Sequence, residues 1–197
     1  MSEAVDFNDN SEKIQKMVLA SLFAALIAVG SYIRIPVGPI PITLQTFFVL
    51  LAAVTLGRKW GVVSIIVYLL VGFIGFPVFT GGSGGIGILF GPTGGYLYSF
   101  VLVAYLVGLL SEKLNAKLNT KLNAKSIPLF IISIFIISAL GSFLILGIGT
   151  IHLAVFTGHD IYPAIFVGFI PFVIGDLIKS MAVALISPIV RKKFNRV

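Results

Sequence analysis

Six long apolar segments follow one another along this sequence, and they constrain its fold more than any other feature. Each is a continuous apolar run close to the ~20 residues with which a helix crosses a bilayer. The polar–apolar alternation of a transmembrane barrel is not seen. The pattern predicts an all-α integral membrane protein, a compact bundle of six transmembrane helices. The segments lie near residues 17–33, 40–56, 60–80, 92–110, 127–150 and 163–190.

The composition agrees with a membrane protein and excludes other classes. Of the 197 residues, 58% are hydrophobic and 11% are charged, whereas a soluble domain carries about 25% charged residues. The sequence has no cysteine, which excludes disulfides, thiolate metal sites and cysteine nucleophiles. His152, His159 and Asp160 share one loop but supply too few clear ligands, so no metal site is predicted.

The basic residues gather on one side of the predicted bundle. Twelve of the 14 Lys and Arg residues lie before the first segment, in two alternate loops and after the last segment. The positive-inside rule assigns that side to the cytoplasm, with both chain termini. Residues 1–16 are then a cytoplasmic tail or short surface helix, 17–190 a single six-helix membrane domain, and 191–197 a basic cytoplasmic tail. The net charge of +7 thus reflects orientation in a cell membrane rather than a nucleic-acid partner.

The loop between the fourth and fifth segments repeats the letters K-L-N every four residues. As a helix it would place Leu114, Leu118 and Leu122 near one face, beside the lysines. Such a helix could lie on anionic membrane lipid. A solvated linker helix fits the same repeat equally well.

Two charged residues, Asp176 and Lys179, interrupt the last apolar segment. Residues three apart on a helix share a face. A charge in the hydrocarbon is costly, so such residues face the bundle interior and find partners there. They could form a structural ion pair that only fixes the helix, but we favour a polar patch that lines a ligand cavity. Pro171, one turn earlier, predicts a kink or the start of regular helix.

A glycine-rich segment covers residues 76–97. Gly82–Gly87 formally matches the G-x-G-x-x-G dinucleotide motif, but no strand precedes it and it lies between two membrane segments, so we reject that interpretation. The sequence also lacks a G-x-x-x-x-G-K-[ST] motif, so the chain is not expected to hydrolyse ATP. We expect a shaped, re-entrant or lid-like loop whose backbone can bind a polar ligand.

Two further patterns lie in the first two segments. Gln45 follows three prolines within an apolar run, and it could bind either a ligand or a neighbouring helix. Ala20, Ala24 and Ala28 recur every four residues, which lets another helix approach closely. Spacing alone favours packing within the chain at these alanines.

Four motifs, taken together and in this order, resemble the BioY family of biotin-binding subunits of energy-coupling-factor (ECF) transporters. The resemblance covers about residues 17–190, nearly the whole chain. One departure is Leu97, where some members carry Arg. The motifs are PITLQ at 41–45, GFPVFTGGSGG at 75–85, GPTGGYL at 91–97 and PFVIGDLIK at 171–179.

The resemblance implies a six-helix protein that binds biotin from outside the cell. It implies uptake driven by a cytoplasmic ATPase pair through a transmembrane coupling subunit, with ATP used only by those partners and no cofactor in this chain. In the family the acid and the lysine of G-D-x-x-K contact biotin, here Asp176 and Lys179, and the polar residue of the G-G-x-G-G loop contributes, here Ser83. Members of the family also use an alanine-rich face of the first helix to dock the coupling subunit, so the resemblance makes Ala20, Ala24 and Ala28 interface candidates.

The chemistry of biotin is compatible with these residues. Asp176 can accept hydrogen bonds from the ureido N–H groups, and Lys179 can donate to an oxygen. The apolar ring and chain of biotin suit walls such as Tyr96 and Phe79. Two alternatives stay open: a capture subunit for another vitamin, or a small ion-coupled carrier or channel in which Asp176 and Lys179 act as gate or proton relay.

Overall fold

The protein is all-helical, as predicted. The computed structural model describes residues 2–37, 40–117, 127–158 and 160–194. The helices are α1 (Ser2–Tyr32), α2 (Gln45–Phe73), α3 (Gly94–Lys117), α4 (Ile127–Thr157), α5 (Ile161–Gly168) and α6 (Ile170–Phe194). A 3₁₀ helix η1 (Ile86–Phe90) and the short strands β1 (Arg34–Ile35) and β2 (Ile42–Thr43) connect them. Five of the helices, all but α5, are long and apolar enough to span a membrane, so the chain is a multi-pass membrane protein.

The helix α2 reverses its direction at Gly57. That residue has φ 76° and ψ −176°, a conformation that glycine adopts without steric cost. A Cβ on Gly61 would lie 3.0 Å from the Cα of Ala53, whereas eight residues of straight helix rise about 12 Å. The two halves of α2 therefore fold back on each other. They correspond to the second and third predicted segments.

The last predicted segment is divided near its start. α5 ends at Gly168, and Phe169 has φ −121° and ψ −63°, which separates α5 from α6. Pro171 lies in the first turn of α6, where a backbone N–H has no helical partner to lose. This agrees with the predicted start of regular helix at that proline. Asp176 therefore lies only about 9 Å along α6 from its first residue.

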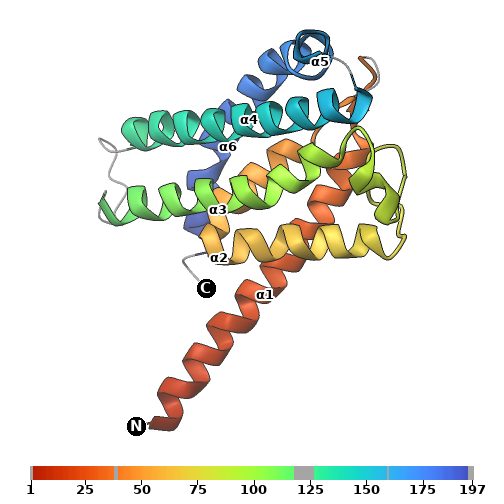
Figure 1. Ribbon diagram of the computed structural model, residues 1–197. Helices are drawn as coiled ribbons and strands as arrows, with labels where there is room; N and C mark the ends of the chain where they lie inside the picture. The colour runs from red at the N-terminus through yellow and green to blue at the C-terminus, as the bar shows by residue number, and fades with distance from the viewer. Residues whose placement is uncertain (1, 38–39, 118–126, 159, 195–197) are drawn as a thin grey trace.

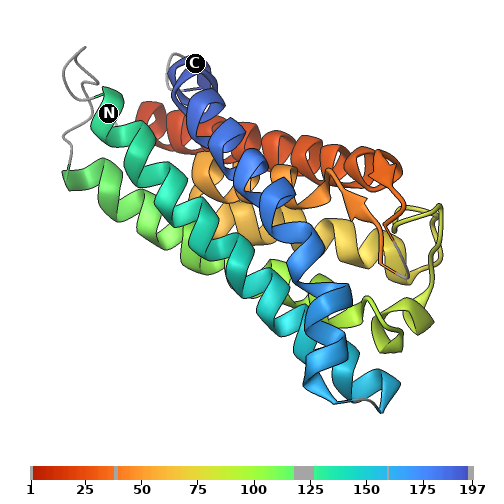
Figure 2. The same ribbon diagram turned by 90° about the horizontal axis from the view of Figure 1, so that it is seen from above.

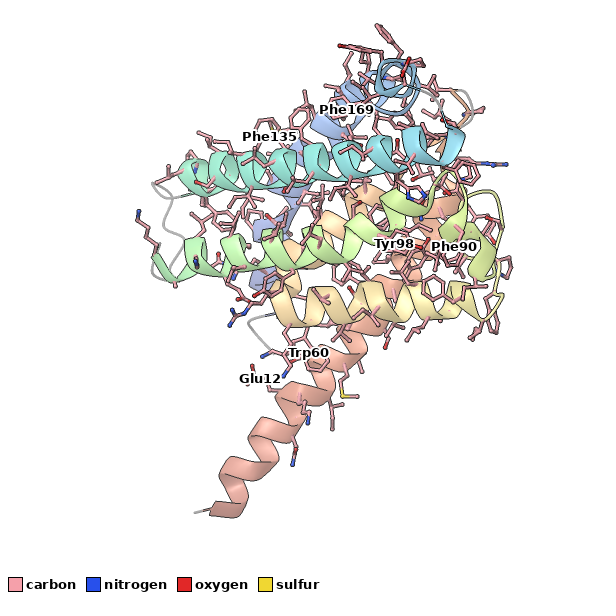
Figure 3. All side chains as sticks on the ribbon, in the orientation of Figure 1. Glu12, Trp60, Phe90, Tyr98, Phe135 and Phe169 are labelled. Atoms are coloured by element: carbon pink, nitrogen blue, oxygen red, sulfur yellow. The ribbon has the colours of Figure 1, made fainter. Side chains whose placement is uncertain are left out.

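The helices pack mainly against their neighbours along the chain. α2 contacts α1, α3 and α6, and α4 contacts α3 and α6. In both views the β1–β2 hairpin and the glycine-rich segment lie side by side at one end of the bundle (Figures 1 and 2). The Tyr32 hydroxyl donates a hydrogen bond to the carbonyl of Pro77, which ties the end of α1 to that segment. Figure 3 shows Trp60, near the turn at Gly57, at the opposite end from Phe90 of η1.

Several predictions fall at the ends of the chain or outside the described residues. The predicted N-terminal tail, residues 1–16, is part of α1 from Ser2 onward, and this part of α1 extends beyond the other helices (Figure 1). Most of the K-L-N repeat, at 118–126, lies outside the described residues, as do His159 and residues 195–197. The interpretations attached to them stay predictions.

Candidate functional site

A cavity of about 260 Å³ lies where α2, α3, α4 and α6 meet the hairpin and the glycine-rich segment. Its size is close to the lower end of small-molecule pockets, about 300–1,000 Å³. All six residues predicted to contact a ligand line this one cavity, although they come from four separate parts of the sequence. They are Gln45, Phe79, Ser83, Tyr96, Asp176 and Lys179.

Asp176 and Lys179 form an ion pair in the wall of the cavity. Lys179 Nζ donates to Asp176 Oδ1 at 2.7 Å and to Thr46 Oγ1 at 2.9 Å. The Thr46 hydroxyl in turn lies 3.4 Å from Asp176 Oδ1. The side chains of Asp176 and Lys179 are 4% and 11% exposed. α6 supplies both charges, and the first turn of α2 supplies the hydroxyl that connects them.

The second carboxylate oxygen of Asp176 has no partner within the described residues. Oδ2 is buried and accepts no hydrogen bond from the protein. A buried charged oxygen without a donor is costly, and the large majority of such atoms are satisfied in folded proteins. Because Asp176 also lines the cavity, a donor on a bound ligand would remove that cost.

Gln45 organises a second polar cluster beside the cavity. Its Nε2 donates to the Tyr68 hydroxyl at 2.6 Å. Its Oε1 accepts from the hydroxyls of Thr80 at 2.9 Å and Thr43 at 3.0 Å. Gln45 thus joins both halves of α2 to the glycine-rich segment, and it lines the cavity as well. From the sequence, Gln45 could bind either a ligand or a neighbouring helix. Its place in the structure is compatible with both roles.

The glycine-rich segment has a fixed shape. Phe79 N donates to Ser83 O at 2.9 Å, and Ser83 Oγ donates to Thr80 O at 2.9 Å. Gly81 and Gly82 have positive φ angles of 81° and 74°. These contacts turn the segment tightly around Ser83 and place its side chain in the cavity wall. This agrees with the expected shaped loop.

Two aromatic residues form walls of the cavity, as expected. Phe79 is 1% exposed and meets Tyr68 edge to face, with 5.6 Å between ring centroids. The Tyr96 hydroxyl donates to Gly168 O at 2.8 Å, so Tyr96 presents its ring rather than its hydroxyl to a ligand. The other apolar wall residues are Ile40, Leu97, Phe100, Ile145, Leu146 and Phe172.

Other polar wall residues were not predicted as ligand contacts. Arg34, Thr46, Thr80 and Thr93 also line the cavity. The sequence offered a signal for two of them: Thr46 interrupts an apolar run, and Arg34 is the only basic residue of the predicted outer loops. Thr80 and Thr93 lie within the glycine-rich segment and resemble ordinary loop residues in the sequence.

The alanines of α1 lie mostly on its buried side. Ala20 and Ala24 are 2% and 7% exposed within the chain itself, and Ala28 packs partly buried against the core. Small residues let a second helix approach, and here the helix that packs on α1 is α2. The exposed side of α1 instead carries larger residues such as Val18, Leu22 and Val29. Ala20 and Ala24 are therefore buried within the chain alone, and their role in docking a coupling subunit stays a prediction.

The fold and the cavity define a class: a multi-pass helical membrane protein with a cavity between its helices and two loops at one end. The family model "BioY family" matches residues 2–196. The chain belongs to the BioY family, which confirms the resemblance of the four motifs.

Curated relatives and a solved structure resemble nearly the whole chain. The chain is 43% identical over 174 residues to the biotin transporter BioY of Thermotoga maritima, covering 88% of this chain and 94% of that protein. It is 43% identical over 175 residues to the biotin transporter BioY2 of Lactococcus lactis, covering 88% of each. A crystal structure of the S component for biotin from an ECF-type ABC transporter superposes with a TM-score of 0.81, at 27% identity over 93% of this chain and 94% of that one.

Proposed function

We propose that this protein binds biotin with high affinity and is the substrate-capture subunit of an ATP-driven ECF transporter. The relatives named above are biotin transporters, and the fold is that of a biotin S component. The observation that carries the proposal is that Asp176, a residue of the cavity wall, has a buried Oδ2 without a hydrogen-bond partner among the described residues. It is an acceptor for a ligand that brings its own N–H groups, and the ureido ring of biotin has two.

The cavity matches the parts of biotin chemically. Asp176 Oδ2 accepts a ureido N–H, and such a charge-assisted bond is stronger than a neutral one. Lys179 has three N–H donors, two of which go to Asp176 and Thr46, so a third can reach a ligand oxygen. The rings of Phe79 and Tyr96 cover the apolar ring system and chain, and Ser83 and Gln45 supply further polar contacts.

The orientation in the membrane follows from the basic residues. With twelve of them on one side, both termini are cytoplasmic. The hairpin and the glycine-rich segment then face outward, so biotin enters from outside. The chain itself performs no reaction. A transmembrane coupling subunit and a cytoplasmic ATPase pair supply the energy, and membrane lipid surrounds the helices.

The test is a calorimetric titration of the purified protein in nanodiscs with biotin, thiamin and riboflavin. We expect heat and saturation with biotin only. No saturation with biotin would contradict the proposal, and saturation with another vitamin instead would support the alternative capture function.

A second measurement separates capture from transport by the chain alone. The protein is placed in liposomes with a proton or sodium gradient, and uptake of labelled biotin is followed. We expect uptake only when the coupling subunit, the ATPase pair and ATP are added. Gradient-driven uptake by the chain alone would favour an ion-coupled carrier.

A further inference from the structure

Arg34 brings a positive charge to the end of the cavity formed by the two loops. It is the first residue of β1, it pairs with Thr43 of β2, and it lines the cavity. Its guanidinium group lies against the backbone of the glycine-rich segment: a Cβ on Gly81 would be 2.7 Å from Arg34 Nη1. The glycine at position 81 thus leaves room for this side chain beside Ser83 and Thr80.

Arg34 has no acidic partner in the part of the chain that the structure describes. The ion pairs found there join Lys16 to Glu12, Arg58 to Glu112 and Lys179 to Asp176. The charged side chains that line the cavity are Arg34, Asp176 and Lys179. Because the last two neutralise each other, the cavity carries one net positive charge. That charge belongs to Arg34 and is complementary to an anionic ligand.

Arg34 and the ion pair belong to different parts of the cavity wall. Asp176 and Lys179 come from α6, whereas Arg34 comes from the hairpin and lies against Gly81. A ligand with a polar ring at one end and a carboxylate at the other offers a partner to each of these two parts. Guanidinium groups match carboxylates with paired N–H donors.

We propose that Arg34 determines specificity for an anionic ligand by binding the carboxylate of the ligand beside the hairpin, while Asp176 and Lys179 hold its polar ring beside α6. This inference rests on the proposed biotin function. It fixes the orientation of biotin: ureido ring toward α6, carboxylate toward the hairpin. It also predicts that biotin derivatives with a neutral tail bind more weakly than biotin.

The experiment compares biotin with biotinamide, which keeps the rings and chain but has a neutral amide tail. Both are titrated against the wild-type protein, Arg34→Gln, Arg34→Lys and a control variant, Lys59→Gln, which removes one positive charge at the opposite end of the bundle. A bond between charged groups is worth more than a neutral one, but Arg34 is exposed to water, which lowers that value. We therefore expect Arg34→Gln to weaken biotin binding about tenfold.

The pattern across ligands decides the inference. We expect Arg34→Gln to bind biotinamide as the wild type does, Arg34→Lys to keep most of the preference for biotin, and Lys59→Gln to change nothing. Equal weakening of both ligands by Arg34→Gln would assign Arg34 to loop structure and overturn the inference, as would no change with either ligand. If the wild type binds neither ligand, the proposed function fails first, and this inference fails with it.

Discussion

Two ion pairs of the same chemical type lie at opposite ends of the bundle, and they differ in what surrounds them. Asp176 and Lys179 are almost fully buried beside a cavity, and one carboxylate oxygen is left without a donor. Arg58 and Glu112 are 52% and 43% exposed at the turn of α2. There both oxygens of Glu112 are used, one by the backbone N–H of Arg58 at 2.9 Å and the other by its side chain at 3.3 Å.

The difference separates the proposed ligand site from a structural ion pair. At the turn, the acid satisfies the backbone where the chain reverses, and each of its two oxygens has a partner within the chain. In the cavity wall, Asp176 Oδ1 accepts a hydrogen bond from Lys179, but Oδ2 has no partner among the described residues. We therefore expect a charged pair in a membrane helix to bind a ligand when its residues line a cavity and one of its charged atoms is buried without a partner. The following variants test that distinction.

The largest effect is expected for Asp176→Asn. Removing one partner of a buried ion pair costs about 3–5 kcal/mol, because the other charge stays buried alone. We expect the free energy of unfolding to fall by about that amount and biotin affinity to fall about a hundredfold or more, since a bond to a charged group is lost. Thermal unfolding in detergent and calorimetric titration measure the two quantities.

The double variant Asp176→Asn, Lys179→Gln is the control for this prediction. It removes both charges, so no buried charge is left unpaired, and we expect it to unfold later than Asp176→Asn. Biotin binding should stay lost because neither ionic contact is present. Recovery of binding together with stability would mean that the pair is structural only, like the pair at the turn.

An intermediate effect is expected for Gly57→Ala at the other end of the bundle. The φ of 76° strains any residue with a Cβ, and a Cβ here would collide with the Glu112 carboxylate. We expect a loss of about 2–3 kcal/mol in stability with unchanged biotin affinity in the folded protein. Gly147→Ala is the matched control, since its Cβ would meet no atom within 4 Å. Weakened biotin binding in Gly57→Ala would show that the two ends are coupled.

The helices could be predicted from the sequence, but their contacts could not. Continuous apolar runs indicate membrane helices because a backbone in lipid must satisfy its own hydrogen bonds. The same runs are apolar on every side, so they do not reveal which face meets another helix. Only the spacing of the small residues Ala20 and Ala24 pointed to packing within the chain, and both are buried there. The break at Phe169 was equally hidden, since Phe169 is as apolar as its neighbours.

The site could be predicted where polar residues interrupt apolar segments. Asp176, Lys179 and Gln45 stand out for this reason, and the family motifs added Ser83. Arg34 could not be assigned, because its place depends on the pairing of β1 with β2 and on the glycine-rich segment, which comes more than 40 residues later. Contacts between loops distant in the sequence leave no periodic pattern.

The smallest effect is expected for Glu112→Gln. This variant measures how much the ionic attraction between Glu112 and Arg58 contributes to stability. The amide oxygen can still accept the Arg58 N–H, so only the exposed ionic attraction is lost. Such attractions are worth about 0–1 kcal/mol, which corresponds to a melting temperature lower by at most about 4 °C. Biotin affinity should not change.

Glu112→Ala separates the charge from the hydrogen bond at this turn. It removes the acceptor as well, so it should cost about 1 kcal/mol more than Glu112→Gln. If both variants lowered the melting temperature equally, the ionic attraction would be the stabilising part, contrary to our expectation. The backbone hydrogen bond would then contribute little to the reversal at Gly57, which would depend mainly on the glycine itself.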